Sequence, residues 1–401
     1  MMATDTDTDT DATSIHRPAV LAAQAAERSG FLPERIVHLH PTRLCNLACL
    51  HCYSESDPQQ TAALETQALC QALTVLRAEG YALLSLSGGE PLVYPPLLDV
   101  VRFAKGLGFR VTMISNGLLL NARFDALLDV LDGVAISFDG LEATHNHWRG
   151  RADAFKRACA AVKYVAERGQ SSGQSSGQNS GQPSSRGAAA AISLTRDAMA
   201  ELPDLADLLV DLGARALQIR PVARAGRARG LADAVFYSPA DELRLHLVAK
   251  ALQQELPDVR VHCDLAPAQG LWQQRQAYAG LLGGLSGAGD DDGVFDPGVL
   301  PHAQRPLADL LNPLVITETG VLKPIAYDFD GRFDVGRIDG LSVETLTAYK
   351  THSLAPFQAL MGSALAGLQD QQRLLDWFDH CTRLSERRGR IPIRPEVQHA
   401  A

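Results

Sequence analysis

The sequence predicts an α/β fold: a parallel sheet curved into a partial barrel, followed by a C-terminal extension. From residue 34 to about residue 230, segments with strand character alternate with segments whose apolar residues have helical spacing. Such alternation is typical of a parallel sheet, because parallel strands need helical crossovers between them. After that point the alternation fades, which indicates a second unit of different construction.

The six predicted strands of the barrel are short β-rich runs, and a helical segment separates each strand from the next. The strands cover residues 35–40, 81–88, 109–115, 133–138, 188–194 and 216–222. The helices cover residues 61–80, 96–108, 123–132, 153–169 and 202–213. Six such units fit a partial barrel, in which the loops after the carboxyl ends of the strands carry the chemistry.

The chain divides into three regions. Residues 1–33 are acidic and repetitive, and we interpret them as a disordered N-terminal tail. Residues 34–230 form the predicted barrel, and a Gly-, Ser- and Gln-rich stretch at 169–187 indicates a flexible insertion within it. Residues 231–401 form the extension, with a helix expected over 238–256, a strand over 259–263, hairpins over 313–338 and mainly helix over 355–388.

Composition excludes several classes of protein. The chain of 401 residues is 46% hydrophobic and 21% charged, which is ordinary for a globular protein with a sizeable core. Its net charge of -9 argues against a nucleic-acid binder, which would normally present a basic face. No apolar run approaches the ~20 residues that span a membrane. The N-terminus lacks the basic and apolar regions of a signal peptide, so we expect a cytoplasmic protein.

Three of the seven cysteines lie within eight residues, in the stretch CNLACLHC after the first predicted strand. These are Cys45, Cys49 and Cys52. A structural zinc site is one interpretation, with His51 as a fourth ligand. However, His51 adjoins Cys52, and adjacent side chains rarely converge on one small ion. A cubane iron–sulfur cluster is larger and suits thiolates from one wrapped loop, leaving one iron for a ligand that is not protein. The spacing favours a cluster over zinc and leaves both open.

Polar and glycine residues follow the second and third predicted strands. Gly88 and Gly89 let the backbone approach a ligand closely, and Glu90 offers a carboxylate to an ammonium group. A tight turn with a helix-capping Glu is the alternative interpretation of this SGGEP stretch. The third strand ends in SNG, which supplies Asn116.

The fourth predicted strand ends in SFDG and places Ser137 and Asp139 on the same side, at a period of two residues. A hydroxyl and a carboxylate together suit a ribose diol, although a turn and a helix cap would use the same residues. Downstream, Arg149 is a candidate clamp for a carboxylate, because a guanidinium binds that group through two hydrogen bonds. A solvated surface arginine is the alternative.

Together, CNLACLHCY, SGGEP, SNG, SFDG and HNHWRGRADAFKRA resemble the radical S-adenosylmethionine enzymes, in particular the branch with SPASM or twitch extensions. The resemblance covers roughly residues 34–225. It implies a partial (βα)6 TIM-like barrel and one [4Fe–4S] cluster on Cys45, Cys49 and Cys52. It also implies S-adenosylmethionine on the fourth iron, with Gly88, Gly89 and Glu90 at its ammonium, Ser137 and Asp139 at its ribose, and Arg149 at its carboxylate.

The extension departs from the family pattern. Residues 314–338 have the SPASM outline, yet Ile325 stands where a cysteine is expected. Beyond the barrel only Cys263 and Cys381 remain, which are too few for a normal cluster. We therefore interpret 231–401 as a degenerate SPASM-like domain without an auxiliary cluster. Cys70 and Cys159 fall on predicted helices and are expected in the core.

The function implied by the resemblance is reductive cleavage of S-adenosylmethionine to a 5′-deoxyadenosyl radical, which removes a hydrogen atom from a substrate. The degenerate extension favours a maturase of ribosomally made peptides. A radical step on a small metabolite or cofactor precursor is the alternative among enzymes, and a non-catalytic zinc or iron–sulfur protein is the alternative outside them. We expect an external reductant such as flavodoxin or ferredoxin, and a separate leader-binding protein or the extension to bind the peptide's leader.

Overall fold

The structure is a computed structural model that describes residues 34–171, 187–273 and 302–386. The predicted N-terminal tail and nearly all of the predicted insertion lie outside the described residues. Within those ranges, no helix is long and apolar enough to cross a membrane.

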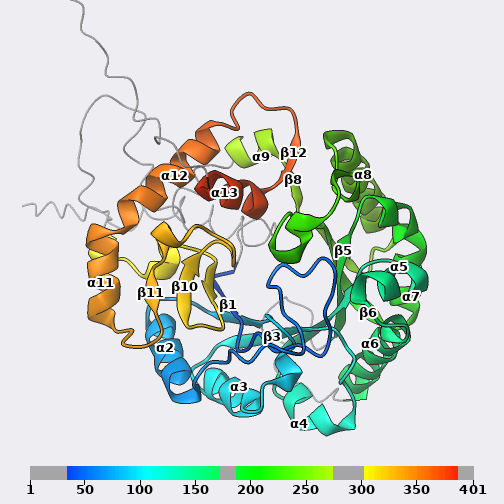
Figure 1. Ribbon diagram of the computed structural model, residues 1–401, viewed down its shortest axis with the longest axis horizontal. Helices are drawn as coiled ribbons and strands as arrows, with labels where there is room; N and C mark the ends of the chain where they lie inside the picture. Colours follow the sequence, from blue (N-terminus) through cyan, green and yellow to red (C-terminus); the bar gives the residue numbers. More distant parts are fainter. Residues whose placement is uncertain (1–33, 172–186, 274–301, 387–401) are drawn as a thin grey trace, which may run out of the picture.

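A ten-stranded sheet forms the centre of the molecule, in the order β11-β10-β9-β1-β2-β3-β4-β5-β6-β7 (Figure 1). Strands β9 and β1 to β7 run parallel, while at one edge β10 pairs antiparallel with both β9 and β11. The first seven strands are β1 (Ile36–Leu39), β2 (Leu83–Leu86), β3 (Arg110–Ser115), β4 (Gly133–Phe138), β5 (Ala188–Leu194), β6 (Ala214–Pro221) and β7 (Arg260–Cys263). The others are β9 (Leu314–Ile316), β10 (Val321–Pro324) and β11 (Gly336–Arg337). The expected α/β fold with a parallel sheet is confirmed.

Helices surround the sheet in an arc, as Figure 1 shows. They are α2 (Thr66–Ala78), α3 (Leu97–Gly106), α4 (Asp125–Leu128), α5 (Glu142–Arg149), α6 (Ala154–Ser171), α7 (Leu202–Asp211) and α8 (Pro239–Glu255). Burial alternates along β3 and β4, because one side of the sheet packs on these helices. Val37 and Leu39 of β1 are fully buried there, while His38 lies on the opposite side in register with Ser85. The inner side of the barrel is therefore more polar than its outer side.

The C-terminal part continues the barrel's own sheet, since β9 pairs with β1. It also contains α9 (Ala268–Gln273), α11 (Val343–His352), α12 (Leu354–Ala366), α13 (Trp377–Glu386), and a two-stranded sheet of β8 (Leu265–Pro267) and β12 (Leu374–Asp376). A buried ion pair, 3.0 Å between Lys350 Nζ of α11 and Glu79 Oε2, anchors this part to the end of α2. The Tyr81 hydroxyl adds a hydrogen bond of 2.7 Å to the Leu311 carbonyl.

Two predicted helices are shorter than expected. The segment 61–80 becomes helical only at Thr66, because Ala63 bridges Thr42 and the Leu64 amide donates to the Pro41 carbonyl. The segment 123–132 forms a 3-10 turn at Ala122–Phe124 and the four-residue α4. Conversely, α5 was not expected, and 374–376 forms a strand inside a segment predicted as mainly helical. In each case tertiary contacts outweigh local propensity.

The cysteines outside the loop after β1 lie at scattered places. Cys70 lies on α2 and Cys159 on α6, the predicted helices, but both are only partly buried rather than in the core: Cys159 packs against the core and Cys70 does not. Cys263 ends β7 and Cys381 is buried in α13. Ile325, in the place of the expected cysteine, is buried with φ of 66°. A β-branched residue rarely adopts this left-handed conformation.

Candidate functional site: a three-cysteine loop at the barrel mouth

The three cysteines lie in the loop that follows β1, at the carboxyl ends of the strands. Cys45 and Cys49 are buried and Cys52 is partly buried, and the three pack with Leu47, Leu118 and Ala154. The Cys52 amide donates to the Cys49 carbonyl over 3.3 Å, which curls the loop. A short loop with three cysteines thus gathers them in one apolar cluster.

The donor set fits an iron–sulfur cluster better than a single metal ion. Among the residues that the structure describes, no three His, Cys, Asp or Glu side chains converge to hold one metal ion. His51, the alternative zinc ligand, points to Asp139, with 2.8 Å between Nε2 and Oδ1. Burial raises the pKa of Cys45 to about 12 and also raises that of Cys49. Bound iron stabilises the thiolate form of such ligands.

The SGGEP turn after β2 lies directly against the cysteine loop. A Cβ on Gly89 would lie 2.2 Å from the Leu44 carbonyl oxygen, and a Cβ on Gly88, where φ is 101°, would lie 2.9 Å from the Cβ of His40. The amides of Gly89 and Glu90 donate to the carbonyls of Thr42 and Leu44 over 3.0 Å each. Both glycines are therefore needed for this close approach.

The buried carboxylate of Glu90 stabilises the turn through hydrogen bonds. Its carboxylate accepts hydrogen bonds from the Ser115 hydroxyl and from the amides of Asn116 and Leu92 over 2.9 to 3.2 Å, and the residue is 1% exposed. Burial raises the pKa of Glu90 despite these bonds. This is the capping arrangement that the sequence offered as an alternative. Contact with an ammonium group stays a prediction.

Asn116, directly after β3, reaches across to the cysteine loop. Its Nδ2 donates to Asn46 Oδ1 over 2.7 Å and lies 3.9 Å from Cys45 Sγ, while its Oδ1 accepts from the Leu118 amide. The end of the third strand thereby fixes the side of the loop that carries Cys45.

Asp139 and Arg149 bind each other. Arg149, the last residue of α5, forms a two-bond ion pair with Asp139, in which Nη2 donates to Oδ1 over 2.9 Å. Arg149 Nη1 also lies 4.0 Å from Cys49 Sγ. Burial alone would raise the pKa of Asp139, but Arg149 and His51 outweigh it and hold that pKa well below its ordinary value. Ser137 lies on β4, two residues before Asp139, and is partly exposed.

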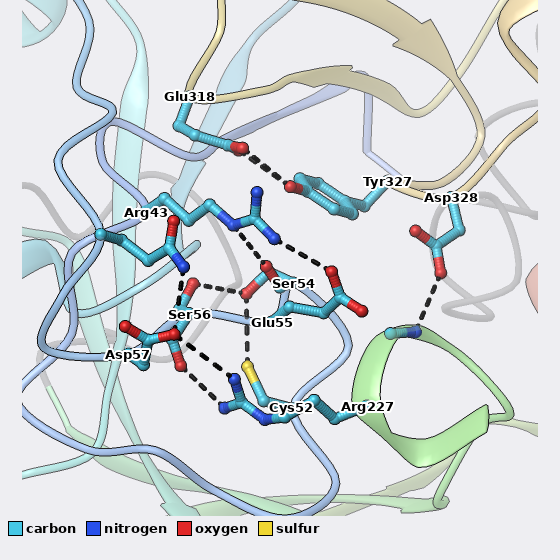
Figure 2. Close-up of polar contacts among 12 residues, drawn as sticks. Arg43, Cys52, Ser54, Glu55, Ser56, Asp57, Arg227, Glu318, Tyr327 and Asp328 are labelled. Atoms are coloured by element: carbon cyan, nitrogen blue, oxygen red, sulfur yellow. Dashed lines mark hydrogen bonds and ion pairs between the residues drawn. The ribbon is translucent and has the colours of Figure 1, made fainter. Parts of the chain in front are cut away.

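The sequence reasoning missed several residues that complete this region. The Tyr53 hydroxyl lies 3.2 Å from both His40 Nε2 and Ser87 Oγ, and the ring of Tyr327 stacks on His40 with 4.8 Å between centroids. Figure 2 shows Tyr327 donating to Glu318 beside the loop. Tyr53 follows Cys52 and could have been found by adjacency. Tyr327 and Glu318 come from the C-terminal part, and no sequence signal placed them here.

A cavity of about 510 Å³ opens beside the carboxyl end of β6, between α8, α12 and α13. Its lining is polar and of mixed charge, with Arg224, Arg373 and Arg383 beside Glu242 and Asp376. Burial, followed by the nearby carboxylate of Asp264, raises the pKa of Asp376 to about 7. Residues 221–224, which line this cavity, are followed within a few residues by Arg227, which contacts the cysteine loop.

Comparison with known proteins places this region in a family. Residues 39–177 match the model of the radical SAM superfamily. The chain is similar to GTP 3′,8-cyclase of Chlorobaculum tepidum, at 34% identity over 130 residues, which are 31% of this chain and 39% of the relative. It is similar to the antilisterial bacteriocin subtilosin biosynthesis protein AlbA of Bacillus subtilis, at 26% over 194 residues, 47% of this chain and 40% of the relative.

Two further comparisons cover more of the chain. Mycofactocin maturase MftC of Mycobacterium ulcerans is 28% identical over 264 residues, 64% of each chain. The solved structure of anSMEcpe with bound AdoMet and Kp18Cys peptide has a TM-score of 0.54 at 14% identity, over 87% of this chain and 88% of that chain. At 14% identity, the similarity to anSMEcpe is evidence for the fold alone. The chain spans about two fifths of the length of the first two relatives.

The matched range contains every residue that the sequence singled out at the strand ends, from Cys45 to Arg149. In the structure the cysteine loop contacts the turn after β2, Asn116 and Arg149. Residues 39–177 are thus the part of the chain that is similar to the radical SAM superfamily, and they contain the cysteine loop and the turn after β2.

Proposed function

We propose that this protein is a radical SAM enzyme that reductively cleaves S-adenosylmethionine and modifies a ribosomally made peptide. The observation that carries the proposal is the cluster of three cysteines on one loop, bordered by the glycine turn after β2, by Asn116 and by Arg149. When bound, a [4Fe–4S] cluster and S-adenosylmethionine supply a 5′-deoxyadenosyl radical that removes a hydrogen atom from the substrate.

In this proposal Cys45, Cys49 and Cys52 hold the cluster. The backbone of Gly88 and Gly89 would meet the ammonium group of S-adenosylmethionine. Ser137 offers a hydroxyl to the ribose. Arg149 neutralises negative charge beside Cys49, and Asp139 holds its guanidinium in place. An external reductant such as flavodoxin or ferredoxin would supply the electron.

Two observations support a peptide substrate. Two of the relatives are named as a bacteriocin biosynthesis protein and a mycofactocin maturase, and the similar fold of anSMEcpe was solved with a peptide. The cavity beside β6 is large enough for several side chains, and its mixed charge suits a polar chain. The likeness to a GTP cyclase keeps a small metabolite as the second candidate.

The test is anaerobic reconstitution with iron and sulfide, followed by S-adenosylmethionine and dithionite. We expect 5′-deoxyadenosine to form, and a protein that binds the metal but forms none would contradict the proposal. Adding peptides encoded by short reading frames beside the gene then separates the substrate classes. A peptide whose mass changes only in the complete reaction supports a maturase, whereas turnover of GTP or another metabolite supports the second candidate.

A further inference from the structure

The segment after β6 forms a clamp on the cysteine loop (Figure 2). Arg227 donates through Nε to the Cys49 carbonyl over 2.8 Å and through Nη2 to the Ser56 carbonyl over 2.7 Å. Its own amide donates to the Cys52 carbonyl over 3.0 Å. One residue therefore holds three carbonyls of the loop, two of which belong to the predicted cluster ligands.

Gly226 allows this contact. Its φ is 49°, and a Cβ there would lie 2.2 Å from the Tyr53 carbonyl oxygen and 2.5 Å from that of Cys52. Backbone atoms cannot move aside as the end of a flexible side chain can. The backbone of the segment thus approaches the loop as closely as glycine permits.

The clamp is attached to the C-terminal part on its other side. The Gly226 amide donates to Asp328 Oδ2 over 3.3 Å, as drawn in Figure 2. Arg229 reaches the same carboxylate oxygen over 3.3 Å and Glu386 of α13 over 2.7 Å. Asp328 follows Tyr327, whose ring stacks on His40. The cysteine loop is therefore connected through Gly226 and Arg227 to the chain beyond β10.

The physical consequence follows from the nature of the loop. A loop without helix or strand lacks the regular hydrogen bonds of those elements, and fixing each of its residues costs backbone entropy. The planar guanidinium donates along two directions at once, so it holds the carbonyls at a fixed separation that an ammonium group cannot reproduce. It also places a positive charge beside the cysteine loop, with the Asp57 carboxylate 4.0 Å from its Nη1.

We propose that Arg227 is a positioning residue that holds the cysteine loop in its cluster-binding shape and raises the cluster's reduction potential, with Gly226 and Asp328 seating it. The cluster part of this inference rests on the proposed function. The part that concerns the shape of the loop does not, since the contacts involve protein atoms alone.

The experiment compares Arg227→Lys, Arg227→Gln and a control, Arg215→Ala, which removes an exposed arginine at the opposite end of β6. Hydrogen exchange of residues 43–57 is measured on the metal-free protein, and iron content and midpoint potential on the reconstituted protein. Both Arg227 variants should exchange faster in this loop and bind less iron, with the control unchanged. The glutamine variant should also shift the potential to more negative values, whereas the lysine variant, which keeps the charge, should hold it near that of the wild type.

The outcomes separate the two claims. Wild-type protein that binds no cluster would overturn the proposed function and the cluster part of the inference, while the exchange measurement still judges the clamp. Wild-type protein that binds a cluster, together with Arg227 variants that match the control in exchange, iron and potential, would overturn the clamp alone. Asp328→Ala should reproduce the faster exchange to a smaller extent, because it leaves both guanidinium bonds in place.

Discussion

Replacing Asp139 by Asn should destabilise the folded protein severely. Asp139 is 1% exposed and Arg149 has a side-chain exposure of 12%, so the pair is shielded from solvent. Asn keeps the size and one acceptor oxygen, but it leaves the guanidinium buried without a counter-charge and turns an amide N–H toward a donor. Removing one partner of a buried pair costs ~3–5 kcal/mol. We therefore expect the free energy of unfolding to fall by about 3 kcal/mol or more.

The assay is urea-induced unfolding of the metal-free protein under anaerobic conditions, for the wild type, Asp139→Asn, Arg149→Met and the double variant. The double variant should lose less than the sum of the single losses, because neither charge is then left unpaired. Asp153→Asn, in an exposed cluster with Arg151 and Arg157, is the matched control and should change stability little.

The pH dependence gives a second check. The pKa of Asp139 is held well below its ordinary value, so its ion pair stabilises the fold at all pH values above about 4, where the unfolded carboxyl is ionised. That contribution is lost only as the pH falls through the depressed pKa. The difference between wild type and variant should therefore be constant from pH 8 to about pH 5 and shrink in stronger acid. A difference below about 1 kcal/mol at pH 7 would refute the buried-pair reasoning.

Three further predictions concern the cofactor, the anchor of the extension and a buried acid. Replacing any cysteine of the three-cysteine loop by Ala should abolish iron binding, while Cys381→Ala should leave it intact. The wild type should bind ~4 iron atoms per chain, and about twice that number would refute the prediction of a single cluster. Lys350→Met should lower the unfolding free energy by roughly 3 kcal/mol, because Glu79 is left buried and unpaired, and an unchanged denaturation midpoint would show that the pair contributes nothing. The pKa of Asp376 is raised to about 7, so its burial destabilises the fold progressively as the pH rises from about 4 to 7. Asp376→Asn should remove this decline and be more stable than the wild type at pH 8. If the unfolding free energies of wild type and variant fell equally between about pH 4 and pH 7, this prediction would be wrong.

The sequence by itself determined the barrel and the cysteine loop. Alternating strand and helix patterns predicted β1 to β6 within a few residues, because each parallel strand is a short β-rich run between amphipathic helices. Three cysteines within eight residues must stay together in space, since the chain between them is too short to separate them. The paired glycines of the turn after β2 predicted a close approach of the backbone to a ligand, whereas in the structure they allow its close approach to the cysteine loop.

Only the tertiary structure decided what the charged residues of the site contact. Sequence reasoning assigned Asp139 and Arg149 to different parts of a ligand, whereas α5, which was not predicted, turns them into an ion pair. It gave no sign of Arg227, whose partners lie some 170 residues earlier in the chain. Nor did it predict that β9 would extend the sheet beside β1. Local patterns report the period and burial of a segment, but the partner of a buried charge depends on which distant segments the fold brings beside it.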